Sequence, residues 1–169
     1  MRKILLESLL RRPVTDAPPV IEDSELAALA ASIDVAARRR LGRDLAIREL
    51  DAGSCNGCEL EINALQNAVY DLERFGLRFV ASPRHADVLM VTGPLAKNMR
   101  IAVERTYDAM PAPKWVVAVG DCAVTGGLFA GSYACLGPAE AVLPVTLRIP
   151  GCPPTPTELL KGLLTLLRS

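Results

Sequence analysis

Cysteine is the residue type that stands out chemically in this sequence. The chain contains five of them: Cys55, Cys58, Cys122, Cys135 and Cys152. An odd number, in a chain whose first residues lack the pattern of a secretory signal, fits a disulfide framework poorly. We therefore expect a cytosolic location with reduced thiols available as ligands. Four thiolates gathered at one place bind either Zn²⁺ or an iron–sulfur cluster.

The elements that must position these thiols begin at about residue 45, where short apolar runs alternate with helical patterns. Helices are predicted over residues 59–74, 97–109 and 157–167 from the spacing of their apolar side chains. Strands are predicted at Leu45–Leu50, Leu77–Val80, Val88–Val91, Trp115–Val119 and Val145–Ile149. Alternation of strands and helices at these lengths is typical of a parallel, three-layer α/β sheet.

Three of the loops that follow predicted strands contain cysteine. Cys55 and Cys58 follow the first strand, Cys122 follows the strand at 115–119, and Cys152 follows the strand at 145–149. Ligands of such sheets gather at the carboxyl ends of the strands, so the fold can bring these four thiols to one edge. Cys135 is in no loop of this kind and is predicted to be a small buried apolar residue.

The residues alone leave three interpretations open: an iron–sulfur cluster, a zinc site, or redox-active or unrelated thiols. Structural zinc usually uses two C-x-x-C pairs, whereas this chain has one pair and two isolated cysteines. Glycines near the cysteines allow close approach of backbone amides to cluster sulfurs, and prolines beside Cys152 fix its loop. These features favour the cluster, although a single C-x-x-C is also typical of thioredoxin-like dithiols.

Four motifs in fixed order carry a family resemblance. They are Ser54-Cys-Asn-Gly-Cys-Glu-Leu-Glu61, Val91-Thr-Gly-Pro-Leu95, Val119-Gly-Asp-Cys122 with Gly126-Gly127, and Ile149-Pro-Gly-Cys-Pro-Pro-Thr155. Over about residues 45–167 the chain resembles the small subunit of membrane-bound, group 4 NiFe hydrogenases of the formate hydrogenlyase and hydrogenase-4 type. The same family includes the 20 kDa, B-type subunit of respiratory complex I.

The resemblance implies a flavodoxin-like domain with one 4Fe–4S cluster, held by Cys55, Cys58, Cys122 and Cys152, and no catalytic residue on this chain. It implies an oxidoreductase subunit that transfers electrons beside the active site of a large catalytic subunit. The implied complex also contains another iron–sulfur subunit and membrane-arm subunits, and this chain is a peripheral subunit at the cytoplasmic side of the cell membrane.

Two details of the motifs bear on the position within that family. The C-N-G-C spacing is that of the hydrogenases, whereas complex I subunits have two adjacent cysteines here. The segment Asp121-Cys-Ala-Val-Thr125 around the third implied ligand departs from the family pattern, since many hydrogenases have smaller residues or additional cysteines here. The alternatives are a complex I-like subunit whose cluster donates electrons to quinone and, in another class, a zinc-stabilised scaffold protein.

Three further titratable residues have candidate roles. Glu59 and Glu61 open a predicted helix, where the helix dipole favours acids. By the resemblance, Glu61 is also a candidate for relaying protons or contacting a partner. The single histidine, His85, is predicted to have a role in a loop or an interface, because four thiolates need no fifth ligand.

Composition and charge limit the kinds of partner that this chain can have. Its 169 residues suffice for one domain with a sizeable core. Nineteen basic and nineteen acidic residues cancel, so nucleic acid is not an expected partner. Half of the chain is hydrophobic and its mean hydropathy is +0.26, yet no run approaches the roughly 20 apolar residues of a membrane span. We expect apolar surface to be buried against partner proteins.

The chain is expected to have two parts. Residues 1–44 form an N-terminal helical arm and linker, and residues 45–169 form the iron–sulfur-binding, flavodoxin-like domain. Within the arm, the pattern predicts a short helix over residues 2–12 and an extended linker at Val14–Asp23. A second helix is predicted from about Glu25 to Leu41, with Ser24 as its N-cap and Gly42 at its end.

Overall fold

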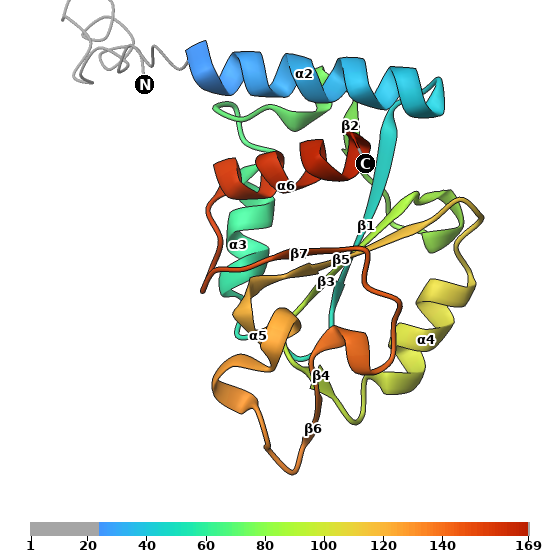
Figure 1. Ribbon diagram of the computed structural model, residues 1–169, viewed down its shortest axis with the longest axis vertical. Coiled ribbons are helices and arrows are strands. Elements are labelled where there is room, and N and C mark those ends of the chain that lie inside the picture. The colour runs from blue at the N-terminus through green and yellow to red at the C-terminus, as the bar shows by residue number, and fades with distance from the viewer. Residues whose placement is uncertain (1–23, 169) are drawn as a thin grey trace, which may run out of the picture.

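A five-stranded parallel sheet forms the centre of the molecule. The computed structural model describes residues 24–168 (Figure 1). The strands are β1 (Leu45–Asp51), β2 (Leu77–Phe79), β3 (Val88–Thr92), β5 (Trp115–Val119) and β7 (Leu147–Ile149). Their order across the sheet is β2-β1-β3-β5-β7, and every neighbouring pair is parallel. Counted along the chain this order is 2-1-3-4-5, which is the flavodoxin-like order.

Helices cover both faces of this sheet and make the outer layers. They are α2 (Ser24–Leu41), α3 (Gly57–Ala64), α4 (Arg100–Asp108), α5 (Gly120–Thr125) and α6 (Pro156–Arg168). Side chains alternate along each strand, so Val88 and Met90 of β3 pack with α2, α3 and α6, whereas Leu89 and Val91 pack with α4 and α5. The predicted three-layer α/β fold is thus confirmed.

Shorter elements complete the chain. Strands β4 (Leu95–Ala96) and β6 (Cys135–Gly137) form a separate antiparallel pair. Single 3₁₀ turns lie at Leu72–Phe75, Pro83–His85, Gly127–Phe129 and Ala139–Ala141. No helix between residues 24 and 168 is both long enough and apolar enough to cross a membrane.

Helix α2 packs directly on α6. Its residues Ile33 and Ala37 are fully buried in the same apolar cluster as β1 and β3. Its bounds confirm the helix that was predicted between Ser24 and Gly42, and the amide of Gly42 bonds to the carbonyl of Arg38 at 2.9 Å. The predicted helix at 2–12 and linker at 14–23 lie outside the described residues.

Helix α3 is much shorter than predicted. The pattern over residues 59–74 predicts one helix, but α3 ends at Ala64 and a turn follows. The side-chain oxygen of Asn67 stabilises this turn, because it accepts bonds from the amides of Val69 and Tyr70 at 2.8 and 3.0 Å. Leu65 and Leu72 still reach the core, since the amide of Leu72 bonds to the carbonyl of Leu65.

Candidate metal centre

Four of the five cysteines line one pocket at the carboxyl ends of the strands. Cys55 and Cys58 come from the segment joining β1 to α3, Cys122 from α5 directly after β5, and Cys152 from the loop after β7. The pocket has a volume of about 100 Å³. Its lining residues are Ser54, Cys55, Gly57, Cys58, Gly93, Asp121, Cys122, Gly151, Cys152 and Pro153. The three cysteine segments named from the sequence therefore meet at one place.

Cys135, the fifth cysteine, lies elsewhere. It begins β6, where it pairs with Ala96 of β4, and it does not line the pocket. It is partly buried.

The four thiols surround the pocket and repel one another when ionised. The pKa of the Cys58 thiol is raised to about 12, first by burial and then by the charges of Glu59 and of the other three cysteines. Burial and the neighbouring thiols Cys152 and Cys55 also raise the pKa of Cys122. A nucleophilic dithiol requires the opposite shift, so the raised pKa values of Cys58 and Cys122 do not suit that role. Within residues 24–168, no three Cys, His, Asp or Glu side chains converge closely enough for a single ion.

Two glycines leave room for the sulfur atoms. A Cβ on Gly120 would lie 2.6 Å from the Sγ of Cys58, and a Cβ on Gly127 would lie 2.8 Å from the Sγ of Cys122. Both glycines have positive φ angles, +85° and +51°, which an L side chain rarely adopts. Any larger residue at either position would push a thiol out of its place.

The backbone of the first cysteine segment is ordered by side-chain oxygens. Asp51 accepts hydrogen bonds from the amides of Gly53 and Ser54 at 2.7 and 2.6 Å. The hydroxyl oxygen of Ser54 accepts from the amide of Asn56 at 3.0 Å. These bonds hold the chain on both sides of Cys55 before α3 begins.

The second and third cysteine segments are joined to each other through Asp121 and Gly151. The amide of Asp121 donates to the carbonyl of Gly151 at 2.8 Å. In return, the carboxylate of Asp121 accepts from the amide of Gly151, also at 2.8 Å. In the sequence Asp121 stands only as one residue of the segment that departs from the family pattern, and the bridge that it makes is a finding of the structure.

These residues fit an iron–sulfur cluster. The donor set is four sulfurs from three separate segments, arranged around a pocket and not at one point. Gly120 and Gly127 leave space beside two of those sulfurs, because a Cβ at either position would collide with a sulfur atom.

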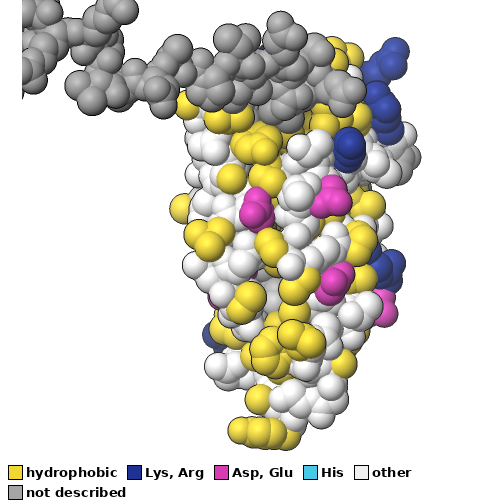
Figure 2. All heavy atoms as spheres, turned by 90° about the vertical axis from the view of Figure 1, so that its left-hand side faces the viewer, with side chains coloured by type: hydrophobic (Ala, Val, Ile, Leu, Met, Phe, Trp, Pro, Cys, Tyr) yellow, Lys and Arg dark blue, Asp and Glu magenta, His cyan; other side chains and the backbone are white. Residues whose placement is uncertain are grey.

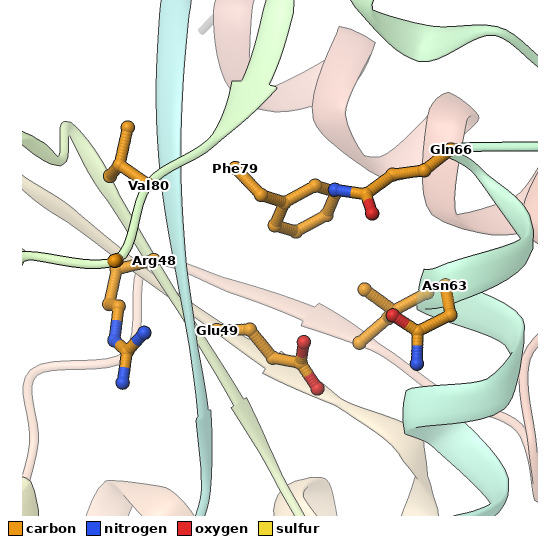
Figure 3. Close-up of a pocket in the computed structure, with 8 residues that line it drawn as sticks. Arg48, Glu49, Asn63, Gln66, Phe79 and Val80 are labelled. Atoms are coloured by element: carbon orange, nitrogen blue, oxygen red, sulfur yellow. The ribbon is translucent and has the colours of Figure 1, made fainter.

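Two acidic side chains, Glu49 of β1 and Glu59 of α3, lie close enough to interact electrostatically. Glu59 is only 8% exposed, and neither of its carboxylate oxygens has a hydrogen-bond partner. Glu49 of β1 lines a second pocket of about 230 Å³, where it points toward Asn63 of α3 while Arg48 points to the other side of the strand (Figure 3). Burial, and then the charge of Glu59, raise the pKa of Glu49.

The other titratable residues singled out from the sequence lie outside the cysteine pocket. Glu61 is half-buried on α3, and His85 is exposed in the turn before β3. Neither lines either pocket described above.

Exposed apolar side chains lie in the segment between α5 and β6, which follows Cys122 in the chain. Leu128 and Tyr133, between α5 and β6, are 92% and 89% exposed, and Phe129 is exposed as well. The backbone of Leu128 also forms a hydrogen bond with Cys122. Figure 2 shows hydrophobic side chains at the lower end of the molecule, where Figure 1 places the segment between α5 and β6.

Comparison with known proteins decides the family. Residues 55–166 match the family described as "NADH ubiquinone oxidoreductase, 20 Kd subunit". The chain belongs to this family. The resemblance seen in the sequence is thereby confirmed, together with membership of a family of oxidoreductase subunits.

Relatives in the family have several names. Formate hydrogenlyase subunit 7 of Escherichia coli is 39% identical over 144 residues, which cover 85% of this chain and 55% of that protein. A probable membrane-bound hydrogenase subunit of Pyrococcus furiosus is 42% identical over 73% of this chain and 74% of its own length. The B-type subunit of the NADH-quinone oxidoreductase of Clostridium beijerinckii is 49% identical over 64% of this chain and 65% of that protein. The chain thus spans little more than half of the first of these relatives.

A solved structure shares the fold. It is the membrane-bound sulfane sulfur reductase, described as an archaeal respiratory membrane complex. One of its chains matches with a TM-score of 0.67 and 32% identity, over 82% of this chain and 74% of that one. The likeness supports the flavodoxin-like arrangement of the 20 kDa family.

Proposed function

We propose that this chain is an electron-transfer subunit that holds one 4Fe–4S cluster through Cys55, Cys58, Cys122 and Cys152. The observation that carries the proposal is the convergence of these four cysteines, from three strand-end segments, on one pocket. When bound, such a cluster accepts and donates one electron at a time. The family match is consistent with this cofactor, because proteins of this family typically bind an iron–sulfur cluster.

The chain's own residues ligate the cluster and control its surroundings. The four thiolates supply the ligands, and Gly120 and Gly127 leave space beside Cys58 and Cys122. Asp51 and Asp121 hold the backbone of the cysteine segments through hydrogen bonds. No residue of this chain is assigned a catalytic role, so bond chemistry belongs to a partner.

The partner that we propose is a large catalytic subunit docked beside the cysteine pocket. The exposed side chains of Leu128, Phe129 and Tyr133 offer it an apolar surface on the segment that follows Cys122 in the chain. By analogy with the relatives, the complex contains a further iron–sulfur subunit and membrane-arm subunits. This chain is then a peripheral subunit at the cytoplasmic side of the cell membrane.

We propose that the chain has the two parts that the sequence suggests. Residues 45–169 bind the cluster, and residues 1–44 form an arm. The described part of that arm, α2, packs against α6 on the side of the sheet that also carries α3.

The substrate of the complex is proposed to be hydrogen or protons, because the C-N-G-C spacing is that of the hydrogenases. A complex I-like assembly in which the cluster donates to quinone is the second candidate, favoured by the relative from an NADH-quinone oxidoreductase. Two C-x-x-C pairs for nickel in the co-purifying large subunit support hydrogenase, and their absence contradicts it.

The ligand set is tested by replacing one cysteine at a time with serine in the assembled complex. We expect each of Cys55→Ser, Cys58→Ser, Cys122→Ser and Cys152→Ser to abolish or alter the electron paramagnetic resonance signal of the reduced cluster. The matched control is Cys135→Ser, which changes a thiol outside the pocket and is expected to leave the signal unchanged. An unaltered signal in Cys122→Ser would overturn the proposed ligands.

A further inference from the structure

Asp121 connects two cysteine segments that lie about thirty residues apart in the chain. Its amide donates to the carbonyl of Gly151, and its carboxylate accepts from the amide of the same residue, both at 2.8 Å. Both residues line the cysteine pocket. Because Cys122 follows Asp121 and Cys152 follows Gly151, this bonded pair lies directly before two of the four proposed ligands.

The Gly151 side of this bridge has little freedom to move. Gly151 has a φ angle of +133°, and a Cβ there would lie 2.7 Å from the backbone of Pro154. The carbonyl of Gly151 also lies 3.4 Å from where a Cβ on Gly120 would be. The backbones of the two segments therefore lie in direct contact, and at this contact the Asp121 carboxylate accepts a hydrogen bond from the Gly151 amide.

The other aspartate of the site works differently. Asp51 accepts bonds from Gly53 and Ser54, which are in its own segment. Asp51 therefore orders one cysteine loop, whereas Asp121 relates one cysteine segment to another. A hydrogen bond to a charged acceptor is stronger than one between neutral groups. The Asp121 carboxylate is therefore well suited to hold two separate segments together.

We infer that Asp121 is a positioning residue for the cluster: its carboxylate fixes the separation of Cys122 and Cys152 through the amide of Gly151. The inference rests on the proposed function, since it concerns two of the four proposed ligands. The carboxylate also places a negative charge at the wall of the pocket. It therefore helps to keep the cluster harder to reduce, because net charge near a cluster sets its potential.

The test compares Asp121→Asn with Asp121→Ala in the assembled complex. Asparagine keeps an oxygen that can accept from Gly151 but removes the charge, whereas alanine removes the acceptor altogether. Three quantities are measured: amide hydrogen exchange of the peptide containing Gly151, the resonance signal of the reduced cluster, and its midpoint potential. Asp51→Ala is the matched control for exchange at Gly151, because its bonds stay within its own loop.

We expect Asp121→Asn to keep slow exchange at Gly151 and the wild-type signal, with the midpoint potential raised. Asp121→Ala should accelerate exchange about tenfold or more, as loss of a hydrogen bond to a charged group implies. Its cluster signal should also be altered or its iron lost. Wild-type exchange and signal in Asp121→Ala would overturn the inference, and so would Asp121→Asn behaving like Asp121→Ala.

If Asp121→Ala does not fold, Asp121→Asn decides the matter by whether exchange at Gly151 stays slow. Failure of the proposed function gives a different result, since the wild-type protein would then contain no cluster. Exchange at Gly151 would still report on the bridge in that case.

Discussion

Arg43 and Asp87 form a bidentate ion pair that joins the starts of β1 and β3. The Nη1 and Nη2 atoms of Arg43 lie 2.9 and 2.6 Å from the two carboxylate oxygens of Asp87. Asp87 is 2% exposed and also accepts from the amide of Ala46 at 2.9 Å. The pair lies at the opposite end of these strands from the cysteines, and it fixes the relation of β1 to β3.

Replacing Arg43 with methionine should destabilise the fold, because the carboxylate of Asp87 stays buried without its cation. We expect a loss of roughly 1–3 kcal/mol in the free energy of unfolding, the range for leaving a buried polar group unpaired. Denaturant unfolding of the purified chain measures it. The control is Arg38→Met, which breaks the exposed pair with Asp34 on α2 and should cost less. Equal losses in the two variants would contradict a special role for Arg43.

Glu49 should make stability depend on pH. Burial and the charge of Glu59 raise its pKa above the ordinary value of 4.5, so the folded protein holds this proton to higher pH than the unfolded chain does. The free energy of unfolding of the wild-type protein therefore falls as pH rises from the pKa of Glu49 in the unfolded chain to its higher pKa in the folded protein. Glu49→Gln should remove this pH dependence. We expect the stability of the variant relative to wild type to be greater at pH 7 than at pH 5.

Unfolding measured at both pH values for each protein gives the comparison. Glu73→Gln, a change at an exposed acid, is the control. A stability difference between Glu49→Gln and wild type that stays constant with pH would contradict the expected titration.

Gly120 should be intolerant of a side chain for a reason beyond its backbone angle. Alanine there would place its Cβ 2.6 Å from the Sγ of Cys58, so we expect iron per chain to fall several-fold. Gly131 is a matched control, since its φ of +78° is close to the +85° of Gly120 but nothing lies within 4 Å of its Cβ position. Alanine at either glycine should cost about 1–2 kcal/mol of backbone strain. Iron analysis separates them, and equal iron loss in both would refute the steric explanation.

Much of the fold could be predicted from the sequence because apolar runs report burial directly. The run Trp115–Val119 forms β5 with the predicted bounds, and the helix predicted after Ser24 ends at Leu41. The rule that ligands gather at the carboxyl ends of parallel strands also predicted that the three cysteine segments meet at one edge of the sheet. Neither inference required knowledge of which strands are neighbours.

Other features depended on contacts that a linear pattern does not contain. The spacing of Leu65 and Leu72 indicates one helix, yet both side chains reach the core from either side of a turn made by Asn67. Likewise, the segment around Cys122 could be recognised as unusual, but the bond of Asp121 to Gly151 depends on where β7 lies beside β5. Arg43 and Asp87 are also brought together only by the pairing of β1 with β3.

The most direct measurement is metal and sulfide analysis of the full-length chain purified without oxygen. A brown protein with about four irons and about four acid-labile sulfides per chain is the predicted result, because one 4Fe–4S cluster is held by four cysteines. A colourless protein with one zinc and no labile sulfide would contradict the electron-transfer function and would support the zinc-stabilised scaffold in its place.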